Sequence, residues 1–223
     1  MDLSIVILIS GRGSNMTAIL DRLERENWPI RVSAVLSNRP DAQGLAHAQA
    51  RGLPTVIVDH AAHQTRESFD AALGNAIDRF APDTIVLAGF MRILTAAFCE
   101  RYAGRLLNVH PSLLPSYTGL DTHARALADG VKFHGLTIHG VTPSLDQGPI
   151  LAQAVVPVLE GDTPEGLASR VLEMEHRVYP EAVAAVVAGL VRWTSLGWVS
   201  GAPRPGFESL RFRPWHVHPE LQR

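Results

Sequence analysis

The sequence predicts an α/β protein whose sheet is doubly wound and mostly parallel, and three observations carry this prediction. Four β-branched and aliphatic runs lie within the first 90 residues, as expected for strands buried on both faces. Apolar residues at helical spacing separate these runs. Later the rhythm changes, and two apolar runs, 134–142 and 150–158, flank a turn that contains Pro and Gly. We expect this pair to add antiparallel strands to a Rossmann-like sheet in the C-terminal half.

The N-terminal half alternates strands with helices. Strands are expected at residues 4–9, 32–36, 54–58 and 84–88, where aliphatic residues are contiguous. Helices are expected from about Met16 to Leu23, from about Ala42 to Arg51 and from about Phe69 to Phe80. Gly52 and Pro82 follow the last two helices, and residues of these types commonly end helices. This βαβα order is typical of a parallel sheet with helical crossovers.

The C-terminal half begins with a fifth strand at residues 105–109, followed by a long proline-rich loop. Thr163 and Pro164 suit the N-cap and the first position of a helix. That helix is expected to reach about Val178, to break at Pro180 and to resume through Leu190, because proline disrupts a helix interior.

The chain of 223 residues is long enough for one large domain. We expect that domain to span residues 1–196, with an N-terminal half at about 1–104 and a second half at about 105–196. Residues 197–223 are rich in Gly, Pro, Arg and aromatic residues, and are expected to form a loosely ordered tail or a partner-facing arm.

Composition argues against several classes of protein. The net charge is −2 and no dense basic run occurs, so a nucleic-acid surface is not indicated. The longest apolar stretch, residues 182–191, is much shorter than the roughly 20 residues of a membrane span. A single cysteine, Cys99, leaves no internal disulfide. With no signal peptide visible, we expect a cytoplasmic protein without a membrane partner.

The residues from Ser10 to Asn15 form a glycine-containing loop between the first strand and the first helix. Free backbone N–H groups and the positive end of the helix suit a phosphate group there. The loop lacks the Gly-Lys-Ser/Thr of a Walker A sequence, and Met16 stands where a dinucleotide fingerprint needs a third glycine. A phosphate on something smaller than a dinucleotide is the better interpretation; a plain tight turn with an Asn cap is the alternative.

Asn108 and His110 lie two residues apart at the end of the fifth strand, so their side chains face one spot. A carboxamide beside a titratable ring suits a reaction that builds an oxyanion and moves a proton. Asp146, in the turn between the two added strands, would stabilise the imidazolium form of His110 if the two side chains meet. A capping histidine and a turn aspartate are the alternative, which leaves the position of Asn108 unexplained.

Residues 89–94 follow the fourth strand, at the sheet edge where open α/β sheets bind ligands. Main-chain groups of residues 91–94 could pair with a flat heterocycle; an ordinary core junction is the alternative. The ten histidines form no familiar metal-ligand spacing, so no metal is expected.

Four segments, in order along residues 4–190, resemble those of the folate-dependent formyltransferases. They are ISGRGSN at 9–15, LAGFMRIL at 87–94, LNVHPSLLP at 107–115, and HGLTIH at 134–139 followed by DQGPI at 146–150. Within the family, the Gly-Ser-Asn loop and Glu175-His176 before Tyr179-Pro180 resemble members that formylate N1-(5-phospho-D-ribosyl)glycinamide (glycinamide ribonucleotide).

The resemblance implies transfer of a formyl group from 10-formyltetrahydrofolate to the glycyl amine, in de novo purine (IMP) biosynthesis, with small-molecule substrates and no metal. It places the phosphate at Gly13, Ser14 and Asn15, and the ribose or the glycyl amine near Glu175. It places the pterin at Met91, Arg92, Ile93 and Leu94, with Arg66 and Asn108 in the same cofactor site. Asn108, His110 and Asp146 would be the catalytic trio: the amine attacks directly, Asn108 and His110 bind the oxyanion, and Asp146 supports the charge of His110.

This chain departs from the family's pattern at Arg12, Ser116, Thr118 and Asp121, which concerns substrate contacts more than chemistry. A sugar-nucleotide formyltransferase is the nearest alternative, and a non-catalytic phosphometabolite-binding domain is the alternative from another class. A transfer-RNA formyltransferase would need a further, basic domain, whereas this chain is short and slightly acidic. A homodimer through the first helices or the added strands is compatible with the pattern.

Overall fold

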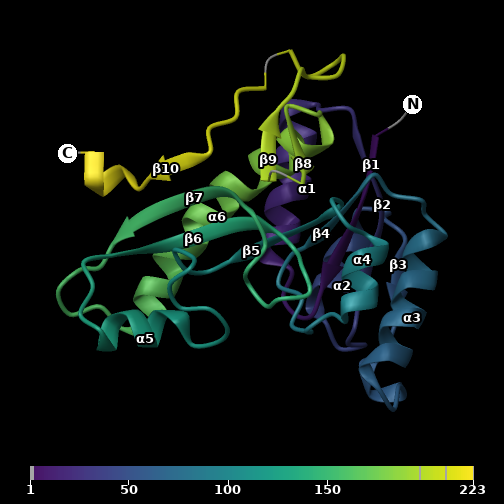
Figure 1. Ribbon diagram of the computed structural model, residues 1–223, viewed down its shortest axis with the longest axis horizontal. Coiled ribbons are helices and arrows are strands. Elements are labelled where there is room, and N and C mark those ends of the chain that lie inside the picture. Colours follow the sequence, from purple (N-terminus) through teal and green to yellow (C-terminus); the bar gives the residue numbers. More distant parts are fainter. Residues whose placement is uncertain (1–2, 196, 209, 223) are drawn as a thin grey trace.

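The computed structural model describes residues 3–195, 197–208 and 210–222, and its centre is an eight-stranded sheet in the order β10-β7-β6-β5-β4-β1-β2-β3. The strands are β1 (Leu3–Ile9), β2 (Ile30–Ser37), β3 (Thr55–Ile57), β4 (Thr84–Leu87), β5 (Leu106–His110), β6 (Phe133–Gly140), β7 (Ile150–Pro157) and β10 (Trp215–Val217). Strands β1 to β5 are parallel, whereas β6 runs antiparallel to both β5 and β7. The predicted α/β class, with antiparallel strands added to a doubly wound sheet, is confirmed (Figure 1).

Helices cover both faces of the sheet (Figure 1). Residues of α1 (Ser14–Glu26), α2 (Gln43–Ala50) and α6 (Pro164–Val187) pack with one core cluster, and residues of α3 (Arg66–Asp78) and α4 (Ala96–Arg101) pack with the other. A further helix, α5 (Thr122–Ala128), contacts α6, and η1 (His60–Ala62) and η2 (Pro219–Gln222) are short 3-10 helices. Strand β1 contributes side chains to both core clusters, with Ile5, Ile7 and Ile9 on one face and Val6 and Leu8 on the other. That alternation explains why β1 is apolar along its whole length.

The start of α1 is held close to the start of α2 by two glycines. Gly13 is the N-cap of α1 and has a φ of 74°, which favours glycine. A Cβ at Gly13 would lie 3.0 Å from the Cα of Gly44, and a Cβ at Gly44 would lie 2.6 Å from Cδ1 of Ile9. Glycine at both positions therefore lets the loop after β1 pack against α2.

Helix α6 runs without a break from Pro164 to Val187, so the predicted interruption at Pro180 is wrong. Thr163 caps the helix as predicted, because its side chain accepts a hydrogen bond from the N–H of Gly166 at 3.1 Å. Pro180 removes one helical N–H, which destabilises a helix interior. Its neighbours Val178 and Tyr179 are fully buried on the sheet, and burial of this face outweighs the local propensity.

The described part of the predicted loose tail, residues 197–208 and 210–222, contains strands and buried side chains. Strands β8 (Val191–Thr194) and β9 (Gly197–Ser200) form a hairpin, and β10 pairs in parallel with β7 at the sheet edge. Phe207 is fully buried in the core, and the indole of Trp198 donates to the carbonyl of Pro149 at 2.8 Å. Such short strands lack the periodicity by which strands are recognised in a sequence. The domain boundary near residue 196 and a partner-facing role of this segment stay predictions.

Among the described residues, no helix combines the length and the apolar character needed to cross a membrane.

Candidate active site

The carboxyl ends of β1, β4 and β5 lie next to one another, and a pocket of about 520 Å³ opens where their loops leave the sheet. The loop from Ser10 to Asn15 lines one part of it, and Met91 and Arg92 line another. Val109 and Pro111, on either side of His110, line the same pocket. Three separate predictions, for the loops after β1, β4 and β5, therefore converge on one region, as expected for open α/β sheets.

One end of this pocket is the N-terminus of α1, where the sequence predicts an anion site. Gly13 precedes Ser14, the first residue of the helix, so the unpaired N–H groups of this first turn face the loop. The side chain of Asn15 is buried, and its Nδ2 donates to Oε2 of Glu175 at 2.6 Å. An anion would thus meet main-chain N–H groups and the Ser14 hydroxyl, whereas the Asn15 amide is engaged by Glu175.

Glu175 reaches this pocket from α6, with only 6% of its surface exposed. Burial raises the pKa of its carboxyl to about 7, and the hydrogen bond from Asn15 opposes that rise. A carboxyl with its pKa raised in this way can carry a proton near neutral pH. It can therefore either accept a hydrogen bond from a bound hydroxyl or amine, or donate one.

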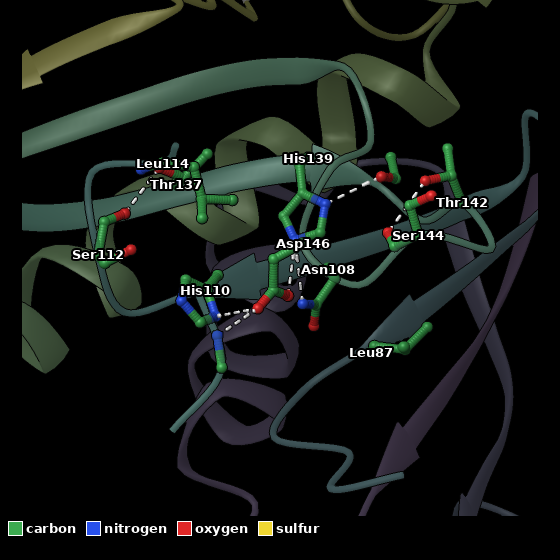
Figure 2. Close-up of polar contacts among 12 residues, drawn as sticks. Leu87, Asn108, His110, Ser112, Leu114, Thr137, His139, Thr142, Ser144 and Asp146 are labelled. Atoms are coloured by element: carbon green, nitrogen blue, oxygen red, sulfur yellow. Dashed lines mark hydrogen bonds and ion pairs between the residues drawn. The ribbon is translucent and has the colours of Figure 1, made fainter. Parts of the chain in front are cut away.

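The second predicted constellation is also brought together. Nδ1 of His110 lies 3.5 Å from Oδ2 of Asp146, and both side chains are only 7% exposed. Figure 2 shows Asp146 between His110 and His139, with Asn108 beside His139. The same Oδ2 accepts a hydrogen bond from the N–H of Gly119 at 2.8 Å, and Asp146 has a φ of 55°. Its carboxylate thus points into the fold and does not serve only as a turn residue.

His110 has a hydrogen-bond acceptor on each side of its ring. Nε2 lies 2.9 Å from the carbonyl oxygen of Tyr117, and Nδ1 faces the Asp146 carboxylate. A proton on either ring nitrogen therefore has an acceptor within reach. Thr137, opposite His110 in β6, holds the intervening loop, since its Oγ1 accepts from Leu114 N–H and donates to the Ser112 carbonyl.

His139 is a fourth member of the cluster that sequence reasoning missed. It is the cross-strand neighbour of Asn108 in the antiparallel pairing of β5 with β6. Its Nδ1 lies 2.9 Å from the Gly140 carbonyl and its Nε2 lies 3.2 Å from Nδ2 of Asn108. The predicted antiparallel strands contained the signal: pairing β6 with β5 in register brings His139 opposite Asn108.

The ring of His139 orients the carboxamide of Asn108. Burial lowers the pKa of His139, which favours a neutral ring at neutral pH. We assign its proton to Nδ1, because the Gly140 carbonyl can only accept. Nε2 then accepts from Asn108, which fixes the amide nitrogen and leaves its other N–H for a substrate atom.

The segment predicted to hold a heterocycle is split between surface and core. Met91 and Ile93 are 68% and 51% exposed, whereas Leu94 is buried in the core. The guanidinium of Arg92 lies 5.7 Å from the ring centroid of Phe69. Arg66 is exposed at the start of α3 and does not line the pocket. Met91 and Arg92 are therefore brought to the pocket, and Arg66 is not.

Other reactive groups of the described chain point to no different chemistry. Its His, Cys, Asp and Glu residues include no group of three or more that could hold a metal ion. Burial raises the pKa of the Cys99 thiol to about 11, which disfavours a nucleophilic thiolate. Arg12 lines the pocket, and Asp121 occupies the N-cap position of α5 without a side-chain cap.

Known proteins share both the sequence and the fold. A family model described as formyl transferase matches residues 3–183. The chain is 45% identical over 204 residues to the phosphoribosylglycinamide formyltransferase of Escherichia coli (strain K12), which covers 91% of this chain and 96% of that protein. It is 40% identical over 188 residues, 84% of this chain, to the human trifunctional purine biosynthetic protein adenosine-3, and spans only 19% of that longer protein.

Solved structures agree. The phosphoribosylglycinamide formyltransferase of Coxiella burnetii aligns with a TM-score of 0.87 at 43% identity, over 98% of this chain and 100% of that one. The glycinamide ribonucleotide transformylase 1 of Symbiobacterium toebii aligns with a TM-score of 0.85 at 42% identity, over 90% and 94% of the two chains. With a family model that matches most of its length and relatives of this identity, the chain belongs to the formyl transferase family.

Proposed function

We propose that this chain transfers the formyl group of 10-formyltetrahydrofolate to the glycyl amine of glycinamide ribonucleotide, a step of purine biosynthesis. One observation carries the proposal: the anion-binding loop at Gly13 and the two neighbours of His110, Val109 and Pro111, line one pocket, and His110 belongs to the cluster with Asn108 and Asp146 at the same strand end. The names of the Escherichia coli and Coxiella burnetii relatives support the same acceptor.

The acceptor substrate spans this pocket from end to end. Its phosphate binds the first turn of α1 at Gly13, Ser14 and Asn15, where the helix dipole and free N–H groups favour an anion. Glu175 is the polar group of α6 in the pocket, and it binds a ribose hydroxyl or the glycyl amine. The amine then lies toward Asn108 and His110.

The transfer needs no covalent intermediate with the enzyme. The nitrogen of the neutral amine attacks the formyl carbon, and the carbonyl oxygen becomes an oxyanion. The free N–H of Asn108 and the Nε2–H of His110 donate to that oxygen, and His110 exchanges the Tyr117 carbonyl for it. Asp146, or a water molecule beside it, carries the amine proton to N10 of the folate. The bond between carbon and N10 then breaks, which gives the formylated amine and tetrahydrofolate.

The donor substrate fits the exposed apolar side chains around the cluster. Met91 and Ile93 present apolar surface after β4. Leu120 and Leu145 are also exposed, and each directly neighbours one residue of the hydrogen-bonded pair Gly119 and Asp146. Main-chain groups of residues 91–94 can pair with the polar edge of the pterin. An aromatic, partly polar ring system is the kind of ligand that such a surface binds.

A turnover assay tests this proposal. Loss of 10-formyltetrahydrofolate is followed by absorbance with and without glycinamide ribonucleotide, and we expect loss only with the acceptor. No turnover with this acceptor would contradict the proposed function. Turnover with an amino-sugar nucleotide instead would identify the alternative acceptor.

Binding of the dephosphorylated acceptor tests the anion loop separately. We expect calorimetry to find glycinamide ribonucleoside bound at least about 100-fold more weakly than the ribonucleotide, since charge-assisted bonds to phosphate contribute about 1.5–3 kcal/mol each. Equal affinities would remove the assignment of the phosphate to Gly13, Ser14 and Asn15.

A further inference from the structure

Ser10 lies where the anion-binding loop leaves β1, and it contacts the loop that follows β4 through two bonds. Its main-chain N–H donates to the carbonyl of Gly89 at 3.1 Å. Its Oγ accepts a hydrogen bond from the main-chain N–H of Met91 at 2.7 Å. The two hydrogen bonds together hold the segment from Gly89 to Met91 next to Ser10.

The direction of the Ser10 hydroxyl is fixed from the other side by Asn38, which follows β2. The hydroxyl donates to Oδ1 of Asn38 at 2.5 Å, and both residues are buried. The main-chain carbonyl of Asn38 in turn accepts from the N–H of His60 at 3.1 Å and lies 2.7 Å from the Nδ1 of that ring. Because the single hydroxyl proton points to Asn38, a lone pair of Oγ remains for Met91.

The segment between β4 and α4, to which Ser10 bonds, has no regular secondary structure. Between the end of β4 at Leu87 and the start of α4 at Ala96 the chain is neither helix nor strand. Side chains from elsewhere bind two of its N–H groups: Ser10 binds that of Met91, and Asp70 binds that of Thr95 at 2.6 Å. Phe90 and Leu94 anchor the segment in the core, whereas the exposed Met91 side chain does not, so the bond from Ser10 sets the main chain at Met91 between these two anchors.

We propose that Ser10 is a positioning residue for the folate co-substrate. Its hydroxyl sets the main chain of residues 91–94 relative to the anion-binding loop, so that the two substrate sites keep a fixed position relative to each other. This inference rests on the proposed function, because residues 91–94 are the segment assigned to the pterin. Ser10 joins the two loops directly, as it belongs to one and bonds to the other.

Steady-state kinetics of Ser10→Ala test the inference. Loss of one tethering hydrogen bond is expected to raise the KM for 10-formyltetrahydrofolate about 3–10-fold, and the KM for glycinamide ribonucleotide by less than about twofold. Ser33→Ala is the matched control, since Ser33 is a buried serine of the same sheet whose hydroxyl has no partner among the described residues. An unchanged folate KM, or an equal rise for both substrates, would overturn the inference.

Hydrogen exchange gives a readout that does not depend on turnover. In the free protein, the peptide that spans residues 88–95 should exchange one amide faster in Ser10→Ala than in the parent or in Ser33→Ala. Asn38→Ala, which keeps the bond to Met91 but frees the hydroxyl, should give a smaller change in the same peptide; it also serves if Ser10→Ala does not fold. Unchanged protection in both variants would show that no tether exists.

These measurements separate the two proposals. A parent protein without turnover would contradict the proposed function. Hydrogen exchange of residues 88–95 would still show whether Ser10 tethers the main chain at Met91. An active parent with an unaltered Ser10→Ala variant would contradict the positioning role alone.

Discussion

The two halves of the site are built differently. The pocket formed by the loop from Ser10 to Asn15 and by Met91 is open, and each of these segments directly follows its own strand. The cluster of Asn108, His110, His139 and Asp146 is mostly buried, with Asn108 half-buried, and it joins two antiparallel strands and a turn. The residues of the first half are placed by the strand that each segment follows, whereas those of the second half are placed by the register of β5 against β6. We expect the open half to govern binding and the buried half to govern the chemical step.

Removal of His110 gives the largest expected effect and tests this division most directly. His110→Ala should lower kcat at least about 10²–10³-fold, the typical loss of an oxyanion donor, and should change the KM for glycinamide ribonucleotide little. Asn108→Ala should behave in the same way. The measurement is steady-state turnover of both variants beside Ser33→Ala, which should resemble the parent. Near-normal kcat in His110→Ala would place the chemistry elsewhere.

Glu175 tests the pocket half through the pH dependence of stability. Its folded-state pKa is about 7, above its ordinary value of 4.5, so the folded chain holds this proton more tightly than the unfolded chain. The stabilisation is complete below pH 4.5 and is lost as the pH rises through 7. For a fully buried group the loss by pH 8 is about 3 kcal/mol.

Glu175→Gln keeps the shape of the side chain and removes the titration. Urea unfolding at pH 5 and pH 8 should show the free energy of unfolding of the parent falling more steeply with pH than that of the variant. Parallel pH dependences for the two proteins would mean that Glu175 ionises normally in the folded state.

His139 sharpens the description of the buried half. His139→Phe removes the acceptor that holds the Asn108 amide, and we expect kcat to fall about tenfold, as for one lost hydrogen bond of about 1.4 kcal/mol. In an Asn108→Ala background the same substitution should cost much less, because the group that it orients is gone. Additive losses in this double-mutant cycle would instead give His139 a role independent of Asn108.

The sequence predicted the pocket half of the site more completely than the cluster half. Residues next to a strand end, such as Ser10 and Met91, could be placed at the pocket because parallel strands bring their carboxyl ends together. Asn108 and His110 could share a face by their spacing alone. The partner of Asn108, His139, could not be identified without the register of β5 against β6.

The remaining errors arise where packing decides. Pro180 stays inside α6 because residues on both sides of it are buried, which no local propensity reveals. The edge strand β10 has three residues, too few for a recognisable pattern, and forms because β7 offers it a free edge. Arg66, suggested by family resemblance, begins α3 as an exposed residue outside the pocket, and its place in the cofactor site stays a prediction.

Tyr179 gives the smallest expected effect and lies at the seam between the halves. Its buried hydroxyl is 3.0 Å from the carbonyls of both Leu87 and Leu107, the residues that lead into the segment proposed to bind the pterin and into Asn108. A single proton is shared between the two acceptors, so Tyr179→Phe should lower the free energy of unfolding by only about 1 kcal/mol. If the clamp also aligns the two strand ends, kcat and the folate KM should both shift by about twofold. Urea unfolding and steady-state kinetics measure the two effects. A stability loss without any kinetic change would mean that the sheet alone keeps the halves aligned.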